Sequence, residues 1–194
     1  MGMSTAEEDL RVRRTLYLLK KALQQLLTEK QLEEISVKEI CVSAMVHRAT
    51  FYKHFQDKYH LFSEILADIR RHISGNREVV LEKKAPAQLY EEFAERALQY
   101  VVDHRTMLQK TLNHNKDSMA YLMIYHAVQD YITDLLHHNR TAVEYILPIE
   151  VISRFTTAGL TALVFFWIET EAEYSQEEML EMINTIIHQN LYFK

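Results

Sequence analysis

The stretch that decides the fold runs from residue 36 to residue 62 and reads SVKEICVSAMVHRATFYKHFQDKYHLF. It opens on Ser36 and Glu39, the serine and glutamate of a capping box, which together satisfy free amides at the start of a helix. A second short helix is predicted over residues 47–54, and residues 44–46 join the two. Two short helices with so tight a connection have the proportions of a helix-turn-helix.

The second helix of this pair has an apolar side and a polar side. Phe51 and Phe55 are spaced so that both point inward and anchor the helix. The side chains left to face a nucleic-acid groove are His47, Arg48, Thr50, Tyr52, Lys53 and His54. Arg48 is the candidate for reading a base, because a guanidinium can bind guanine bidentately in the major groove. A phosphate contact or a solvated surface charge is the alternative for Arg48.

The same stretch resembles the DNA-binding domain of the TetR family of bacterial transcription regulators, of the TetR/AcrR type. The resemblance covers residues 10–62, and the residues that match the family pattern are Thr50, Phe51, Tyr52, Phe55, Lys58 and Leu61. It implies that Thr50, Tyr52 and Lys58 hold the phosphate backbone, with Lys53 and His54 as further candidates of the same kind. Core packing is the alternative for Tyr52, and helix capping is the alternative to a phosphate contact for Ser36.

Two residues depart from the family pattern. Met45 stands in the turn where the family often has glycine, so strain or a variant geometry is expected there. His47 stands where the family commonly has serine or threonine as the cap of the recognition helix. Because histidine caps a helix poorly compared with serine, His47 is a candidate donor to a phosphate or to a base edge.

Glycine and proline are scarce along the whole chain. Its 194 residues include three glycines and two prolines, where average usage would give roughly 14 and 10. Phosphate-binding loops and hairpin turns need glycine to reach positive φ, so a P-loop, a dinucleotide fingerprint and a β-sandwich are excluded. Apolar residues instead recur at three- and four-residue spacing, which predicts an all-α protein of about nine helices.

The helical pattern divides the chain in two at a joint near residues 82–85. Residues 1–75 are predicted to form a helix-turn-helix DNA-binding domain with a three-helix bundle, and residues 76–194 a helical effector-binding and dimerisation domain. Charge divides in the same way: residues 10–77 carry 13 Lys and Arg against 7 Asp and Glu, whereas residues 78–194 carry 9 against 17. A basic front half favours binding of a polyanion there.

The second half is rich in tyrosine, methionine and phenylalanine, which suit either a packed core or a pocket for an apolar molecule. The resemblance favours a pocket and implies a small apolar or amphipathic effector. The candidate lining residues are Phe93, Met123, Tyr125, His126 and Phe155. The resemblance also implies a homodimer through the last two helices, where Gly159 would let backbones approach. A glycine that is simply tolerated in a helix is the alternative.

No arrangement in the sequence indicates catalysis, a metal or a cofactor. Adjacent His137 and His138 would point about 100° apart on a helix, and no cysteine or carboxylate completes a tight ligand set. No nucleophile–base pair or glycine elbow is visible. The protein is therefore expected not to be an enzyme and to have no catalytic residues, metal or cofactor.

The sequence also bears on the compartment. Cys41 is the one cysteine, which favours a reducing compartment and a core role for its side chain. The N-terminal residues lack the basic start and apolar run of a secretory signal. The uncharged apolar section, residues 155–168, is too short to span a bilayer. A cytoplasmic protein without a membrane partner is expected.

These features together predict a homodimeric, sequence-specific DNA-binding transcription regulator, a repressor that a small effector releases from double-stranded operator DNA. A helical protein–protein adaptor that keeps the fold without reading DNA is the alternative.

Overall fold

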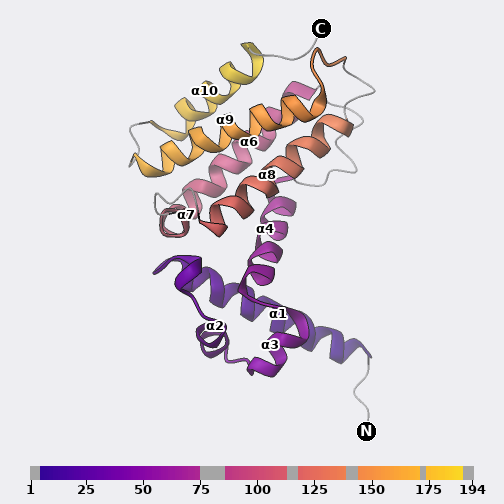
Figure 1. Cartoon of the computed structure of the whole chain (residues 1–194), viewed down its shortest axis with the longest axis vertical. Coiled ribbons are helices and arrows are strands. Elements are labelled where there is room, and N and C mark those ends of the chain that lie inside the picture. Colours follow the sequence, from indigo (N-terminus) through magenta and orange to yellow (C-terminus); the bar gives the residue numbers. More distant parts are fainter. Residues whose placement is uncertain (1–4, 75–85, 113–117, 139–143, 171–173, 190–194) are drawn as a thin grey trace.

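The computed structural model describes residues 5–74, 86–112, 118–138, 144–170 and 174–189 (Figure 1). In these residues the chain forms nine α-helices, one short 3-10 helix and no β-strand, so the predicted all-α class is confirmed. The bounds are α1 Thr5–Leu27, η1 Leu32–Glu34, α2 Val37–Ser43, α3 Arg48–His54, α4 Lys58–Ser74, α6 Pro86–Asp103, α7 Arg105–Leu112, α8 Met119–His138, α9 Ile149–Glu169 and α10 Gln176–Gln189. The predicted joint at residues 82–85 lies outside the described residues.

The helix starts follow the local signals in the sequence. At α2 the Glu39 amide donates to Ser36 Oγ at 3.3 Å, and the Ser36 amide donates to Glu39 Oε2 at 2.8 Å. The same reciprocal pair opens α10, where Ser175 and Glu178 exchange bonds of 2.7 and 3.2 Å. Pro148 immediately precedes α9. The capping box predicted at Ser36 and Glu39 is therefore confirmed, and α10 begins with a second one.

Helices α1, α2, α3 and the first half of α4 enclose one apolar core, in the lower part of Figure 1. Its fully buried side chains include Leu19, Leu23, Leu32, Ile40, Phe51 and Leu61. Met107 of α7 and Ala120 of α8 belong to the same cluster. This core therefore extends past the first four helices into the second half of the chain.

Helices α6 to α10 form the second body, in which α9 lies along α8 and α10 lies along α6 (Figure 1). Trp167 of α9 is 2% exposed, and its indole nitrogen donates to the Tyr174 carbonyl at 2.8 Å. Arg105 of α7 donates to the Trp167 carbonyl at 2.6 Å. These bonds join the end of α9 to the residues before α10 and to the start of α7.

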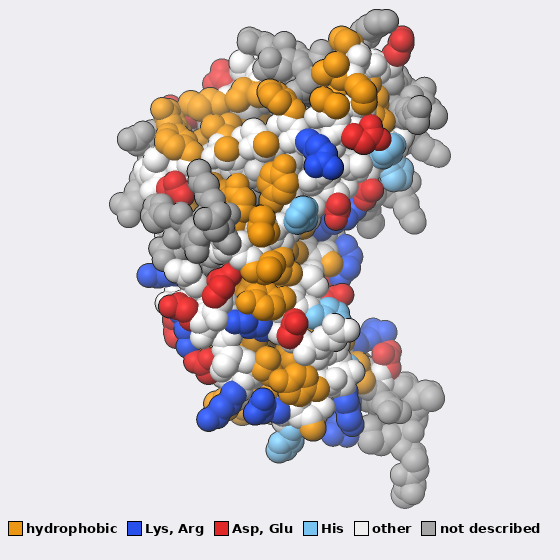
Figure 2. Space-filling model, in the orientation of Figure 1, with side chains coloured by type: hydrophobic (Ala, Val, Ile, Leu, Met, Phe, Trp, Pro, Cys, Tyr) orange, Lys and Arg blue, Asp and Glu red, His pale blue; other side chains and the backbone are white. Residues whose placement is uncertain are grey.

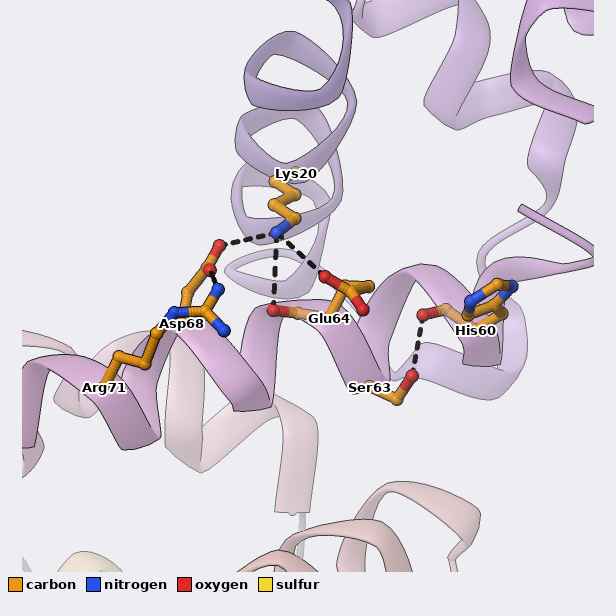
Figure 3. A network of polar contacts seen from close by, with 6 residues as sticks. All are labelled: Lys20, His60, Ser63, Glu64, Asp68 and Arg71. Carbon is orange, nitrogen blue, oxygen red and sulfur yellow. Dashed lines mark hydrogen bonds and ion pairs between the residues drawn. The ribbon is translucent and has the colours of Figure 1, made fainter. Parts of the chain in front are cut away.

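Helix α4 runs from the first body into the second (Figure 1). Figure 3 shows Lys20 of α1 reaching across to α4, where its Nζ donates to Asp68 Oδ2 at 2.6 Å and lies 3.5 Å from Glu64 Oε2. Farther along α4, Arg70 pairs with Asp134 of α8. Helix α4 is thus joined by ion pairs to α1 and to α8.

Helix α9 is the most apolar of the long helices. By length and composition it could cross a membrane, since it has 21 residues and an 18-residue section of mean hydropathy 1.6. The sequence expectation that this segment is too short counted only its uncharged section, and the whole helix is longer. In this fold α9 packs along α8, and its buried residues include Thr157, Thr161, Phe165 and Ile168. Its apolar character is used in these contacts.

Candidate nucleic-acid interface and apolar cavity

The connection between α2 and α3 turns at Met45. This residue is 94% exposed and has a φ of 53°, the one positive φ of a non-glycine residue in the described part of the chain. Its amide donates to the Val42 carbonyl at 3.1 Å, and the Val46 amide donates to the Cys41 carbonyl at 2.9 Å. This pair of bonds is the Schellman arrangement that ends a helix, with methionine where glycine is usual. The strain expected at Met45 is therefore present.

Helix α3 packs on the core through its aromatic side chain Phe51, and its polar side chains face outward. Phe51 is fully buried, and its ring meets the ring of Tyr52 edge-on at 5.4 Å. Tyr52 itself is 52% exposed, so core packing is not its role. His47, Arg48 and Lys53 are exposed, and Thr50 and His54 are half-buried. Figure 2 shows Lys and Arg side chains gathered around the lower end of the molecule, where α1, α2 and α3 lie.

His47 is the N-cap residue of α3, and it caps with its backbone alone. Its carbonyl accepts from the Thr50 amide at 2.9 Å, whereas its imidazole makes no capping bond. The expectation that histidine caps this helix poorly is confirmed. The exposed ring is left available to a phosphate or a base.

Two of the predicted phosphate ligands are used inside the protein. Ser36 Oγ donates to Glu39 Oε2 at 2.7 Å, as part of its capping box. Lys58 Nζ donates to the carbonyls of Glu33 and Ile35 at 2.7 and 2.8 Å, and its burial lowers the pKa of the ammonium. Lys58 satisfies carbonyls at the end of η1 that no helix bond satisfies. Without DNA the Lys58 ammonium is therefore bonded within the protein, and the phosphate role that the resemblance implied for it stays a prediction.

Glu33 of η1 connects the helix-turn-helix to the second body. Its carbonyl accepts from Lys58 at the start of α4, and its side-chain Oε1 accepts from the Met119 amide at 3.0 Å. Met119 is the first residue of α8, where backbone amides lack a helical partner. One residue therefore binds the starts of both α4 and α8.

A cavity of about 190 Å³ lies between α4, α6, α8 and α9. Its lining is apolar except for a few side chains, and it includes Leu66, Ile69, Arg70 and Ile73 of α4, Phe93, Leu98 and Tyr100 of α6, Ile124, Val128, Tyr131 and Leu135 of α8, and Leu160, Thr161 and Val164 of α9. Apolar enclosure with few polar groups is typical of sites for small molecules.

The polar groups of this cavity differ in how far they are satisfied. Arg70 is paired with Asp134, and Thr161 Oγ1 donates to the Thr157 carbonyl at 2.6 Å. The hydroxyl of Tyr100 is buried and has no hydrogen-bond partner among the described residues. Burial also raises the pKa of Tyr100 to about 12. The rings of Phe93 and Tyr131 stack at 4.1 Å and 17°, which gives the cavity one flat aromatic wall.

Comparison with known families agrees with this arrangement. The family model described as bacterial regulatory proteins of the tetR family matches residues 18–65, which contain the helix-turn-helix. The TetR model described as a transcriptional regulator C-terminal region matches residues 89–189, more than half of the chain. The chain belongs to the TetR family. This is a family of bacterial transcription regulators rather than of enzymes.

Individual relatives of this TetR-family chain are distant in sequence. It is 20% identical over 183 residues to YxbF of Bacillus subtilis (strain 168), described as an uncharacterized HTH-type transcriptional regulator; the match covers 90% of the chain but 45% of YxbF. A putative TetR-family regulator from Syntrophomonas wolfei has the same fold, with 19% identity, a TM-score of 0.73 and 93% and 95% of the two chains covered. NalD of Pseudomonas aeruginosa, the secondary repressor of the MexAB-OprM efflux pump, also has 19% identity, with a TM-score of 0.65 and 94% and 98% covered.

The cavity of this TetR-family chain contains one of the five predicted ligand residues. Phe93 lines it, whereas Met123 packs against the front core and Tyr125 is half-buried elsewhere on α8. His126 is exposed, and Phe155 is 67% exposed on α9. These four residues therefore do not line this cavity, and their part in ligand binding stays a prediction. On α8 the cavity side is the face of Ile124, Val128 and Tyr131, turned away from the predicted residues.

Sequence reasoning missed the part that α4 contributes to the cavity. In the sequence, Leu66, Ile69 and Ile73 have the spacing of the core stripe of a helix in the DNA-binding half, and nothing singles out Arg70. The structure places all four on the cavity wall. No local signal in the sequence shows that α4 contributes both to the front core and to the cavity wall, because this arrangement arises from packing between helices far apart in the sequence.

No metal-binding group emerges from the structure. Among the described residues, no three His, Cys, Asp or Glu side chains are grouped so as to hold an ion. Cys41 is 4% exposed within the front core, and its burial raises the pKa of the thiol, so its predicted core role is confirmed. The absence of a metal or cofactor stays a prediction.

Replacement of Met45 with glycine is expected to stabilise the protein by about 0.5–1 kcal/mol. Removing Cβ relieves about 1–2 kcal/mol of left-handed strain, and the greater freedom of glycine in the unfolded chain offsets about 0.5–1 kcal/mol of that gain. Urea denaturation monitored by circular dichroism measures the change. Met45→Ala keeps Cβ and is the matched control, with little expected effect. A destabilised Met45→Gly protein would contradict this account.

Glu39 is expected to make the DNA-binding half sensitive to acid. Its hydrogen bond from Lys30 Nζ at 2.5 Å, followed by those from Ser36, lowers its pKa from 4.5 to about 2. A carboxylate whose pKa is lower in the folded state stabilises the fold fully above its unfolded pKa, and this contribution is lost as pH falls through the folded value. Stability from Glu39 is therefore present above about pH 4.5 and lost towards pH 2.

Denaturation of wild type and Glu39→Gln between pH 2 and pH 7 measures this contribution. The variant lacks the carboxylate, so the difference in unfolding free energy is expected to be largest at neutral pH and to vanish near pH 2. Glu29→Gln, an exposed glutamate nearby, is the control. A difference that does not change with pH would refute the role of the Glu39 charge.

Proposed function

We propose that this TetR-family regulator is a cytoplasmic, homodimeric repressor of a palindromic operator. In this proposal residues 1–75 form the DNA-binding domain and residues 76–194 the domain for effector and dimer. His47, Arg48, Thr50, Tyr52, Lys53 and His54 contact the DNA. A small apolar or amphipathic effector binds the cavity and releases the operator.

One observation carries the proposal: the helix that follows the recognition helix forms a wall of the cavity. Helix α3 ends at His54 and α4 begins at Lys58, and Leu66 and Ile69, farther along α4, line the cavity. A ligand that changes how α4 packs therefore also acts on the position of α3. Release requires that the ligand bind one arrangement of the helices more tightly than the other.

The dimer is supported by the surface of α9 and α10. Val151, Phe155 and Phe166 of α9 are 50%, 67% and 42% exposed, and Ile186 of α10 is 47% exposed. Figure 2 shows hydrophobic side chains gathered along this upper edge. Gly159 lies in the same helix, and a Cβ built there would meet no atom within 4 Å. Large exposed apolar patches mark interaction sites, and a dimer suits two half-sites one DNA turn apart.

Selection of genomic DNA fragments with the purified protein, followed by footprinting, tests the proposal. We expect a protected palindrome whose affinity falls steeply with salt, because phosphate contacts release counterions. Deletion of the gene should raise expression from that promoter, in keeping with the repressor action of NalD. Binding no better to selected than to random duplex would instead favour the adaptor. Lower expression after deletion would make the protein an activator.

A further inference from the structure

Met45 occupies a position that favours glycine, and its side chain gains nothing from packing. Its φ of 53° lies in the left-handed region, where a residue with a Cβ atom is strained. The side chain is 94% exposed, so it makes almost no contact within the protein. Neither the backbone conformation nor the core therefore explains a methionine here. A strained residue that contributes nothing to its own fold indicates a function outside it.

Val42 enlarges the apolar surface at this turn. It is 70% exposed, and its carbonyl accepts from the Met45 amide at 3.1 Å, so the two residues are adjacent. Single exposed apolar side chains are common on proteins, whereas these two lie together at the start of the recognition helix. The turn therefore presents a small apolar surface to the partner that α3 binds.

Met45 lies close enough to α3 to share its groove. His47 is the N-cap of α3 and Arg48 its first residue. Because Arg48 follows Met45 by three residues, their Cα atoms are at most about 11 Å apart, less than the width of the major groove of B-DNA, about 12 Å. Figure 1 shows the α2–α3 connection beside α3 at the lower end of the molecule, away from the second body. A groove that receives Arg48 is thus within reach of Met45.

The chemistry of methionine selects the part of the DNA that Met45 can contact. Lys38, His47 and Arg48 are exposed around it and suit phosphates and the polar edges of bases. The thioether of methionine carries no charge and accepts hydrogen bonds only weakly. The apolar group that the major groove offers is the 5-methyl group of thymine. A flexible, polarisable side chain suits contact with such a group.

We propose that Met45 is a specificity-determining residue whose side chain contacts the methyl group of a thymine in each half-site of the operator. The contact lies outside α3, and a glycine, which would relieve the strain, could not make it. The inference rests on the proposed function, since it takes operator DNA to lie against α3. The strain at Met45 is then retained because the side chain is needed for DNA.

Removal of single methyl groups from the operator tests this contact with the full-length protein. The duplex is the palindrome selected from genomic DNA, with deoxyuridine in place of thymidine at one symmetric pair of positions at a time, so that only 5-methyl groups are lost. For wild type, one such pair is expected to lower the affinity about 15-fold, which corresponds to the burial of one methyl group in each half-site. Fluorescence anisotropy at fixed salt measures the dissociation constants.

The variant Met45→Ala keeps the backbone strain and removes the thioether. It is expected to bind the thymidine duplex at least about 15-fold more weakly than wild type, and to be indifferent to deoxyuridine at the sensitive pair. Its midpoint of urea denaturation is expected to stay close to that of wild type, so loss of folding would not explain the result. Met119→Ala, which truncates a 47% exposed methionine on α8, is the matched control and is expected to behave as wild type.

The variant Met45→Gly separates the DNA contact from the stability of the turn. It relieves the strain and is expected to raise the midpoint of urea denaturation, while it weakens operator binding as much as Met45→Ala does. Because the lost contact is uncharged, the dependence of affinity on salt is expected to stay that of wild type in both variants. A purely structural role of Met45 would change stability and leave the deoxyuridine pattern as in wild type.

Several outcomes would overturn the inference. Equal affinity of wild type and Met45→Ala for the operator would show that the side chain makes no contact. A weaker Met45→Ala variant, with no methyl-sensitive position in wild type, would mean that Met45 contacts the sugar–phosphate backbone instead. A position that stays sensitive in Met45→Ala would assign the methyl contact to another residue, with Val42 as the neighbouring candidate.

The preference of wild type separates this inference from the proposed function. If wild type binds the selected palindrome no better than random duplex, the proposed function fails, and the role of Met45 fails with it. If wild type prefers the palindrome and Met45→Ala has the same affinity and preference, operator recognition stands and only the role of Met45 fails.

Discussion

Replacement of Arg48 with alanine is expected to weaken operator binding by the dimer roughly 30- to 20,000-fold. Arg48 is exposed in the first turn of α3, whereas Phe51 one turn later is buried. One bidentate contact to guanine contributes about 1–3 kcal/mol of discrimination. A palindromic operator contains two such contacts, so about 2–6 kcal/mol is at stake. Gel-shift titration with operator and scrambled duplex measures the loss.

Two further variants identify the kind of contact that Arg48 makes. Lys110→Ala on α7 removes one exposed positive charge away from α3 and is expected to leave operator affinity nearly unchanged. Arg48→Lys keeps the charge but loses the planar fork. If Arg48 reads a base, lysine will not restore the preference for operator over scrambled duplex. Full restoration by lysine would assign Arg48 to a phosphate.

Replacement of Phe51 with alanine is expected to lower the free energy of unfolding by about 3–5 kcal/mol, the usual cost of truncating a large buried aromatic side chain to alanine. Phe51 has no exposed surface and packs against Phe55, with ring centres 5.5 Å apart. The cavity left behind would lie under the recognition helix, so α3 would lose its support. Urea denaturation followed by circular dichroism gives the change from the shift in midpoint.

The adjacent Tyr52 provides the matched contrast. It is 52% exposed, and surface substitutions usually change stability by about 0.5 kcal/mol or less. Tyr52→Ala is therefore expected to weaken operator binding while leaving the unfolding midpoint close to that of wild type. A stability loss at Tyr52 equal to that at Phe51 would mean that α3 is packed on both sides.

The helix-turn-helix could be predicted from the sequence because each signal in it is local. The capping box of Ser36 and Glu39 and the spacing of Phe51 and Phe55 specify helices within a few residues of chain. The missing glycine at Met45 likewise predicted strain, and φ is positive there. The internal bonds of Lys58 could not be predicted in this way, because its partners, the carbonyls of Glu33 and Ile35, lie more than twenty residues earlier.

The cavity could not be predicted in the same way. Composition indicates that aromatic and methionine residues suit a pocket, but it does not say which face of a nearly apolar helix is turned towards one. On α8 the difference is a single position: Met123 and Ile124 both pack on the front core, but of the two only Ile124 also lines the cavity. Which of two neighbouring residues faces the cavity depends on how the helix is rotated about its axis in the folded bundle.

The shared core of the two bodies has a consequence for protein engineering. Met107 and Ala120, from α7 and α8, pack in the cluster that encloses Phe51. In a chimaera that joins residues 5–74 to the effector body of another family member, the side chains that replace Met107 and Ala120 would not be matched to this cluster. To transplant its operator specificity intact, the exchange must also carry α7 and the first turn of α8, or be confined to the outward side chains of α3.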